Sequence, residues 1–340
     1  MATFARTFLV FALLITPLQG EVFVRAQEAS STASTTPVVA EQQGNWYRSE
    51  RIEGNIEVGD FVVGPGRAEI TVSPGETVIQ EITVTNRISK NRTFNLEVED
   101  ITGSADGSSA VSLTNGQRGP YSIKDYVSFP QKSFTLDLGE RARIPVKITI
   151  PADAEPGGFY GSVLVSTDRS PDEKADDVSR SPVIARIGSL LFVRVRGDAE
   201  IGGQTKSIST VGDKMWYEKG PINLSIAYEN TGVVHVNPYG EVSIKNMFGE
   251  EVGFVELDPW FVLPKSLRSR EFDWDREFLL GRYTVTAKIN RGYDNKIDEV
   301  STTFWVLPWK IVLGAFAVLF ILIFSLRAFF RNFEFSKKKK

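Results

Sequence analysis

The chain has 340 residues, with 39 basic and 42 acidic side chains, one histidine and no cysteine. The lack of cysteine excludes disulfides, thiolate nucleophiles and cysteine-ligated zinc or iron–sulfur sites. The single histidine, His235, excludes a multi-histidine metal site and is the one imidazole available to a catalytic triad.

The N-terminal segment has the pattern of a signal peptide. Arg6 precedes an apolar stretch over residues 7–18, which is shorter than the roughly 20 residues that cross a bilayer. Small residues suited to cleavage follow at Gly20 and Ala26. The sequence therefore predicts a signal peptide over 1–26, cleaved after Ala26 or Gly20. The alternatives are an uncleaved anchor or a buried core helix.

Residues 27–55 are predicted to be a flexible linker, because 27–44 are rich in Ser and Thr and poor in large apolar groups. From Ile56 onward, apolar and polar residues alternate in short runs, which places one face in a core and one in water. The clearest runs are 93–99, 134–138, 144–150, 222–229 and 283–290. Many short strands between turn residues indicate a sandwich or barrel.

A weak internal repeat suggests two domains. Each half has a strand ending in Asn (Asn86, Asn230), then a Leu-turn-Arg segment, then a Gly shortly before a Tyr at a strand start (Tyr160, Tyr283). An Asn side chain bonds its own backbone in such a turn, and the Tyr phenol is expected to bond back across a corner. We expect an all-β fold of two tandem Ig-like β-sandwiches, over 56–198 and 199–305, followed by one C-terminal transmembrane helix.

An acidic stretch over residues 167–180 is expected to join two strands of the first sandwich. Its carboxylates suggest a calcium site on paper, but their spacing lacks the Asp-x-Asp-x-Asp-Gly pattern and Lys174 interrupts them. We therefore interpret the stretch as a solvated loop. The carboxylates are Asp168, Asp172, Glu173, Asp176 and Asp177.

The C-terminal segment over residues 306–330 is predicted to be a single transmembrane helix, since 311–326 hold no charge. Tryptophans mark its outer end and positive charges follow it, so the positive-inside rule places the basic tail, 331–340, in the cytoplasm and the preceding chain outside. The predicted membrane-anchor residues are Trp305, Trp309, Lys310, Arg327, Arg331, Lys337, Lys338, Lys339 and Lys340.

The charge of the exported part differs from that of the whole chain. Residues 27–305 carry 40 acidic and 30 basic side chains, a formal charge of −10, whereas the whole chain is at −3. Nucleic-acid binding needs a positive footprint, so the sequence argues against a nucleic-acid partner. The lysines of the tail are expected to contact anionic lipid.

Several short motifs resemble the WxL-interacting protein family of bacterial surface proteins. In the first half these are Ser73-Pro74-Gly75, Val84-x-Asn86, Ile150-Pro151 and the run over 156–161. In the second half they are Ala185-Arg186-Ile187-Gly188, Tyr228-x-Asn230, Leu263-Pro264-x-Ser266 and Leu280-Gly281-x-Tyr283. The resemblance implies two Ig-like domains, the first binding peptidoglycan and the second a cell-surface protein. It transfers no individual binding residue.

Candidate catalytic groups are few, and we expect no enzyme, cofactor or metal. His235 has no Gly-x-Ser-x-Gly elbow to serve and is interpreted as a loop or strand-end histidine. Asp273 and Asp275 flank Trp274, and a strand there would point both carboxylates to one face, as a glycosidase pair would need. We interpret that face as solvated. Trp216, Trp260 and Trp274 are candidates for sugar stacking, but core or domain-junction positions are the commoner role.

The sequence thus predicts a non-catalytic, membrane-anchored binding or scaffold protein that links the bacterial cell surface or wall to a protein partner. The alternative is an accessory or chaperone-like subunit of a membrane export or assembly complex. A hydrolase built on Asp273 and Asp275 is a third, less favoured reading.

Overall fold

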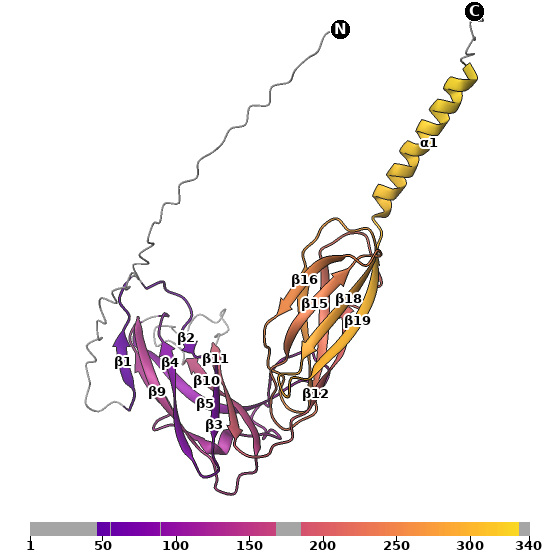
Figure 1. Cartoon of the computed structure of the whole chain (residues 1–340). Coiled ribbons are helices and arrows are strands. Elements are labelled where there is room, and N and C mark those ends of the chain that lie inside the picture. The colour runs from indigo at the N-terminus through magenta and orange to yellow at the C-terminus, as the bar shows by residue number, and fades with distance from the viewer. Residues whose placement is uncertain (1–45, 55, 89, 168–184, 333–340) are drawn as a thin grey trace, which may run out of the picture. The chain divides into compact units, whose positions relative to one another are not determined.

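The computed structural model describes residues 46–332 except 55, 89 and 168–184 (Figure 1). The predicted signal peptide, most of the linker, the acidic stretch from Asp168 on and the lysines at 337–340 lie outside the described residues. The described part is built of β-strands, with one short 3-10 helix (Lys124–Tyr126) and one α-helix at its C-terminal end. The expected all-β fold with a single C-terminal helix is confirmed.

The strands up to Val195 form two sheets around one core. One sheet has the order β1-β9-β4-β2, with β7 also paired to β9, and the other has the order β3-β11-β10-β5-β6, with β8 paired to β5. The strands are β1 (Arg48–Arg51), β2 (Val62–Gly64), β3 (Arg67–Val72), β4 (Thr77–Thr85), β5 (Arg92–Thr102), β6 (Ser112–Leu113), β7 (Val127–Ser128), β8 (Ser133–Leu136), β9 (Glu140–Thr149), β10 (Gly157–Thr167) and β11 (Arg186–Val195).

The predicted alternation places the core of this first sandwich correctly. Phe94, Leu96 and Val98 of β5 are buried, as are the alternate residues of β9, and the residues between them face outward or lie half-buried; beyond Val98 the alternation of β5 ends, because Glu99, Asp100 and Ile101 are all buried. One face of each strand is covered because the two sheets pack against each other, which is the reason for the period of two. All strand pairs in this sandwich are antiparallel except β3 with β11, which run parallel.

The strands from Gly203 form a second pair of sheets with a separate core. One sheet has the order β12-β14-β17 and the other β13-β19-β18-β15-β16. The strands are β12 (Gly203–Thr210), β13 (Trp216–Tyr217), β14 (Ile222–Asn230), β15 (Tyr239–Lys245), β16 (Glu251–Leu257), β17 (Ser266–Trp274), β18 (Gly281–Asn290) and β19 (Ile297–Val306). The helix α1 (Trp309–Asn332) follows β19 directly.

The repeated asparagines do what the sequence predicts. Asn86 is buried; its Nδ2 donates to the carbonyl of Leu136 (2.9 Å) and its Oδ1 accepts from the amide of Ile88 (3.0 Å). Asn230 is also buried; its Oδ1 accepts from the amide of Gly232, and its Nδ2 donates to two carbonyls, of Val234 and Val262. Each asparagine closes the turn after its strand and also bonds a carbonyl of a second chain segment, at Leu136 for Asn86 and at Val262 for Asn230.

The two repeated tyrosines differ from each other. The Tyr283 hydroxyl bonds back to Leu280, accepting from its amide at 3.0 Å, as a corner tyrosine is expected to do. The Tyr160 hydroxyl instead reaches His235, 75 residues away in the second sandwich. The prediction that the Tyr160 phenol bonds back across a corner is therefore wrong, because its hydrogen-bond partner lies in the other half of the chain.

A third hydrophobic cluster joins the two sandwiches. Its fully buried members are Ile101, Tyr160 and Phe192 from the first half and Leu263 from the second. Beside it, the segment after β5 lies along the free edge of β17: the amide of Leu267 donates to the carbonyl of Ser104 (3.0 Å), and that of Ser269 donates to Gly107. The sandwiches are therefore locked by shared apolar packing and by backbone hydrogen bonds.

Two predicted boundaries differ from the structure. Residues 48–51, which the sequence assigns to the linker, form β1 on the edge of β9, and the ring of Tyr47 packs into the first core. Val306, assigned to the membrane span, is the last residue of β19 and is buried, so the helix begins three residues later at Trp309. Both segments are short and polar or mixed, so neither shows a clear alternation of apolar and polar residues from which its boundary could be predicted.

Candidate binding site at the sandwich junction

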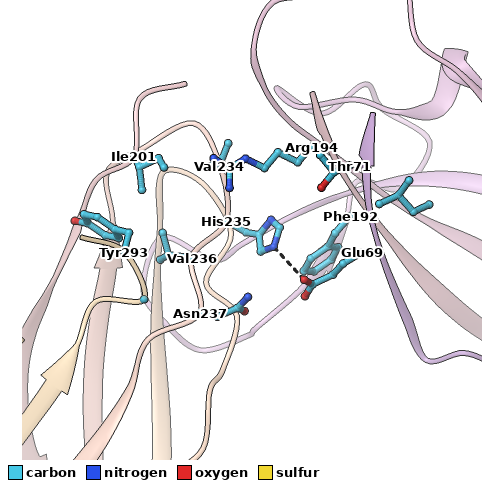
Figure 2. Close-up of a pocket in the computed structure, with 12 residues that line it drawn as sticks. Glu69, Thr71, Phe192, Arg194, Ile201, Val234, His235, Val236, Asn237 and Tyr293 are labelled. Atoms are coloured by element: carbon cyan, nitrogen blue, oxygen red, sulfur yellow. Dashed lines mark ion pairs between the residues drawn. The ribbon is translucent and has the colours of Figure 1, made fainter. Parts of the chain in front are cut away.

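A pocket of about 350 Å³ opens where β3 and β11 of the first sandwich meet the segment before β15 in the second. Figure 2 shows Glu69, Thr71, Phe192 and Arg194 on one side and His235 projecting toward them from the other. The remaining lining residues are Ile70, Ile201, Val234, Val236, Asn237, Gly292 and Tyr293. Both charged and aromatic groups therefore face one cavity.

His235 is held at this pocket by Tyr160. The backbone amide of His235 donates to the Tyr160 hydroxyl at 2.6 Å, and the same hydroxyl lies 3.1 Å from His235 Nδ1. The ring of Phe192 packs against the imidazole, with centroids 5.1 Å apart. When Nδ1 accepts a hydrogen bond from the Tyr160 hydroxyl, a neutral imidazole carries its ring proton on Nε2. Nε2 faces Glu69 Oε2 at 3.8 Å across the junction.

Arginines surround the same cluster. Arg67 pairs with Glu69 at 3.1 Å and lies over the rings of Phe192 and Phe261. Arg268 of β17 lies 4.2 Å from the Phe261 centroid. These cation–π contacts place guanidinium groups over the aromatic rings of the junction, so they add to its packing.

Burial sets the protonation of the junction. It raises the pKa of the Tyr160 phenol well above its ordinary value, so this hydroxyl stays protonated and acts as a hydrogen-bonding group. Burial lowers the pKa of His235 below its ordinary value of 6.5; Glu69 opposes this shift, while Arg67 and Arg194 add to it. His235 is therefore neutral at pH 7.

This geometry suits binding better than catalysis. The imidazole contacts a buried phenol where a triad would place a serine or threonine hydroxyl, and the phenol has a raised pKa. Among the residues that the structure describes, no group of three or more histidine, aspartate or glutamate side chains is arranged to hold a metal ion. The interpretation of His235 as a loop histidine is confirmed, with the junction as its setting.

The other sequence candidates lie elsewhere. Asp273 is exposed in β17, and Asp275 is exposed just beyond the end of that strand, which agrees with the interpretation of this face as solvated. Trp260 and Trp274 are buried in the second core, in agreement with the structural interpretation. Trp216 is 62% exposed and stacks on Trp305 with ring centroids 5.5 Å apart.

The described anchor residues lie in β19 just before α1 and near the two ends of α1. Trp305 belongs to β19, whereas Trp309 and Lys310 begin the helix and both contact Glu218: Trp309 Nε1 donates to it at 2.7 Å and Lys310 Nζ lies 3.6 Å away. The Trp309 hydrogen bond is the main cause that lowers the Glu218 pKa. Arg327 and Arg331 are exposed in the last turns, and the helix is long and apolar enough to cross a membrane.

Sequence reasoning missed most of the junction. Glu69, Arg194 and Tyr293 stand in ordinary strand or turn contexts, and only the topology brings them to His235. The one usable signal was the repeated Gly157 and Tyr160, whose phenol was expected to bond back across a corner and instead contacts His235.

Comparison with known proteins gives structural neighbours alone. No family model matches the chain, and no curated protein matches it. Among solved structures, the chain is similar to a chaperone–tip adhesin complex of CFA/I fimbriae (11% identity, 72% of this chain, 99% of the other, TM-score 0.38) and to the class 5 fimbriae chaperone CfaA (11%, 73%, 100%, 0.36). It is also similar to the E. coli chaperone DraB (15%, 74%, 98%, 0.33).

These values are too low to carry function across. All three identities are below 25% and all three TM-scores are below 0.5, so a role for this chain has to come from its own residues. The resemblance to the WxL-interacting family stays a prediction, since no comparison bears on it.

Proposed function

We propose that this chain is a membrane-anchored, extracytoplasmic binding protein without catalytic activity, whose two Ig-like sandwiches hold an extended segment of a partner protein in a chaperone-like manner. The observation that carries the proposal is the junction pocket, which is bordered by an edge strand. Strand β3 is the last in its sheet among the described residues, and three consecutive residues of it, Glu69, Ile70 and Thr71, line the pocket.

An edge strand of this kind is suited to bind a peptide. Its outer backbone groups are free to pair with an added strand, while pockets beside it select side chains. The side chains of Glu69 and Thr71 on β3 are exposed, so a peptide that added to this edge could contact them. Arg194 adds an exposed guanidinium that forms no ion pair with any described residue, and a guanidinium matches the geometry of a carboxylate.

The groups around the pocket also favour binding over turnover. The Tyr160 hydroxyl and His235 satisfy each other, and Glu69 is already paired with Arg67, so no strong nucleophile faces the cavity. Locking of the sandwiches by the junction cluster keeps the pocket preformed, which lowers the entropic cost of binding.

The test is site-specific photo-crosslinking in the intact chain in its own membrane. We expect p-benzoylphenylalanine at Thr71 to form adducts with a protein outside the cytoplasm, identifiable by mass spectrometry. The matched control is the same group at Lys147, which is exposed in the central strand β9 of the other sheet. Equal or no protein adducts at the two positions would overturn the proposal.

Purification of the intact chain from its own membrane distinguishes the two hypotheses about the partner. A chaperone-like subunit co-purifies in detergent with integral membrane or exported proteins. A cell-wall linker, the role that the family resemblance implies for the first sandwich, pellets with isolated peptidoglycan. The junction pocket favours the first, because its features are those of a site for an extended chain and it offers few exposed aromatic faces on which a sugar could stack.

A further inference from the structure

A second surface lies at the end of the second sandwich from which α1 starts. We define this helix-proximal end by the connecting segments 211–221, 246–250, 275–280 and 307–308. Strand register brings them together: Gly281 pairs with Val306, Lys245 with both Thr284 and Glu251, and Trp216 with Trp305. Figure 1 shows α1 continuing from β19 at this end.

The tips of these segments carry large apolar side chains that are exposed. They come from three different connections, and the exposed fraction ranges from 51% to 80%: Met215, Trp216, Met247, Phe248, Phe278 and Leu280. At the opposite end of the same sandwich, the exposed large hydrophobic residues are Ile201, Tyr239 and Ile297. A cluster of this size on an otherwise acidic exported chain marks a contact surface.

The connections are held in place, so the cluster is a built feature. The amide of Gly220 donates to the carbonyl of Glu277 at 3.2 Å, and the amide of Trp305 donates to the carbonyl of Met215 at 2.8 Å. Trp216 stacks nearly parallel on Trp305, at 17° between planes. A β-carbon at Gly281 would lie 2.9 Å from Met247 Sδ, so the Met247 side chain of the hairpin tip lies against the start of β18.

We propose that this helix-proximal end inserts its apolar tips into the outer interface of the bilayer that α1 crosses. The proposal rests on the membrane anchorage in the proposed function. The continuity of the chain indicates that the bilayer is what covers the apolar tips. Two residues separate the end of β19 from Trp309, and Trp309 at the helix start donates a hydrogen bond to Glu218 in the β13–β14 connection. The connection from Val306 to Trp309 spans at most about 11 Å, so this end of the sandwich is the one held next to the membrane surface when α1 spans the bilayer.

The residue types fit the interface. Indole rings favour the headgroup layer, and phenylalanine and methionine tips enter the acyl boundary with adaptable packing. Charges between the tips are of both signs, for example Lys219 and Arg276 beside Asp275 and Glu277. The attraction is therefore hydrophobic, and we expect it to be independent of anionic lipid.

The experiment uses the absence of native cysteine. Single cysteines are placed in the full chain at Glu277, beside the Phe278 tip, at Gln204, exposed at the far end, and at Val318, in the middle of α1. Each is labelled with a nitroxide and reconstituted into vesicles of dioleoylphosphatidylcholine, with and without one quarter dioleoylphosphatidylglycerol. Power saturation with oxygen and a water-soluble nickel complex then gives the depth of each label.

We expect the Glu277→Cys label to be several-fold less accessible to nickel than the Gln204→Cys label, at a depth between water and the Val318→Cys label, in both lipids. Adding Phe248→Ser and Phe278→Ser should return the Glu277→Cys label to aqueous accessibility. If that label matches the far end while Val318→Cys is deep, the insertion is refuted and the anchor stands. If Val318→Cys is aqueous, the anchor itself is refuted. Loss of both nickel and oxygen access at Glu277→Cys would indicate protein contact and also refute insertion.

Discussion

At the scale of single residues, His235 is the side chain whose protonation is coupled to the junction. Its imidazole is 11% exposed and contacts Tyr160, and the charged groups that face it are Glu69, Arg67 and Arg194. Burial holds the His235 pKa below 6.5, whereas the unfolded chain has an ordinary histidine. The unfolded state therefore binds more protons as pH falls through and below 6.5, and the free energy of unfolding decreases in that window.

This predicts a pH dependence that one substitution reduces. Wild-type chain in detergent should lose more stability between pH 8 and pH 5 than the His235→Gln variant, because the variant lacks the titrating imidazole. Urea unfolding followed by tryptophan fluorescence at the two pH values measures the difference. Glutamine lowers stability at both pH values by disturbing the packing, so the comparison is between slopes. Identical slopes in the two proteins would refute the role assigned to His235.

A second residue-scale prediction concerns the buried asparagines that close the strand-end turns. Asn230→Ala and Asn86→Ala remove the donor that satisfies buried carbonyls, such as that of Val262 for Asn230. Each should lower the free energy of unfolding by about 1–3 kcal/mol, the usual cost of leaving such groups unpaired. Asn223→Ala, at an exposed position of β14, is the matched control and should change it by less than about 0.5 kcal/mol. Equal effects at Asn223 and Asn230 would contradict this account.

At the scale of elements, the strands with one buried face were predictable and the edges were not. β5, β9, β14 and β18 show their alternation because each is covered by the facing sheet on one side. The short edge strands β1, β2 and β13 are two to four residues long, too few for a period to stand out. Their place is fixed by a neighbour strand, so it follows from the tertiary fold.

The junction was hidden for the same physical reason. Tyr160 was singled out, yet its partner lies 75 residues along the chain and has no local signature. The segment after β5 likewise adds to β17 through backbone groups, which every residue carries. Gly103 in the segment after β5 indicates a close approach to β17 only once its neighbours are known. A β-carbon at Gly103 would lie 2.3 Å from the Ser266 hydroxyl oxygen.

That close approach gives an element-scale prediction. Gly103→Val should push the segment off β17, so the amides of Leu267 and Ser269, which donate to it, should exchange hydrogen at least about tenfold faster. Gly66→Val is the control, since space around Gly66 is open. Hydrogen exchange read by mass spectrometry on peptides covering residues 266–269 measures the change. Unchanged protection in Gly103→Val would show that the segment is not held by this contact.

At the scale of the whole molecule, the formal charge differs between the two sides of α1. Residues 27–305 have a formal charge of −10, whereas beyond α1 the chain carries Lys337, Lys338, Lys339 and Lys340 against Glu334 alone. A binding pocket at an edge strand and an apolar set of loop tips at the start of α1 are both useful to a protein held at a membrane surface. Both proposals therefore depend on the same orientation of the helix.

The orientation has a direct test, because the chain has no cysteine of its own. Positive residues after an apolar helix stay on the cytoplasmic side, so a cysteine at Lys340 should be shielded in intact cells without an outer barrier, and one at Gln204 should react with a membrane-impermeant maleimide. Permeabilisation should expose Lys340→Cys fully and leave Gln204→Cys unchanged. Replacing the four terminal lysines with glutamine should raise the fraction of inverted chains, since only Arg327 and Arg331 then remain of the positive charges that follow the apolar stretch. The reverse labelling pattern in the starting protein would place the pocket in the cytoplasm and end the proposal of an extracytoplasmic partner.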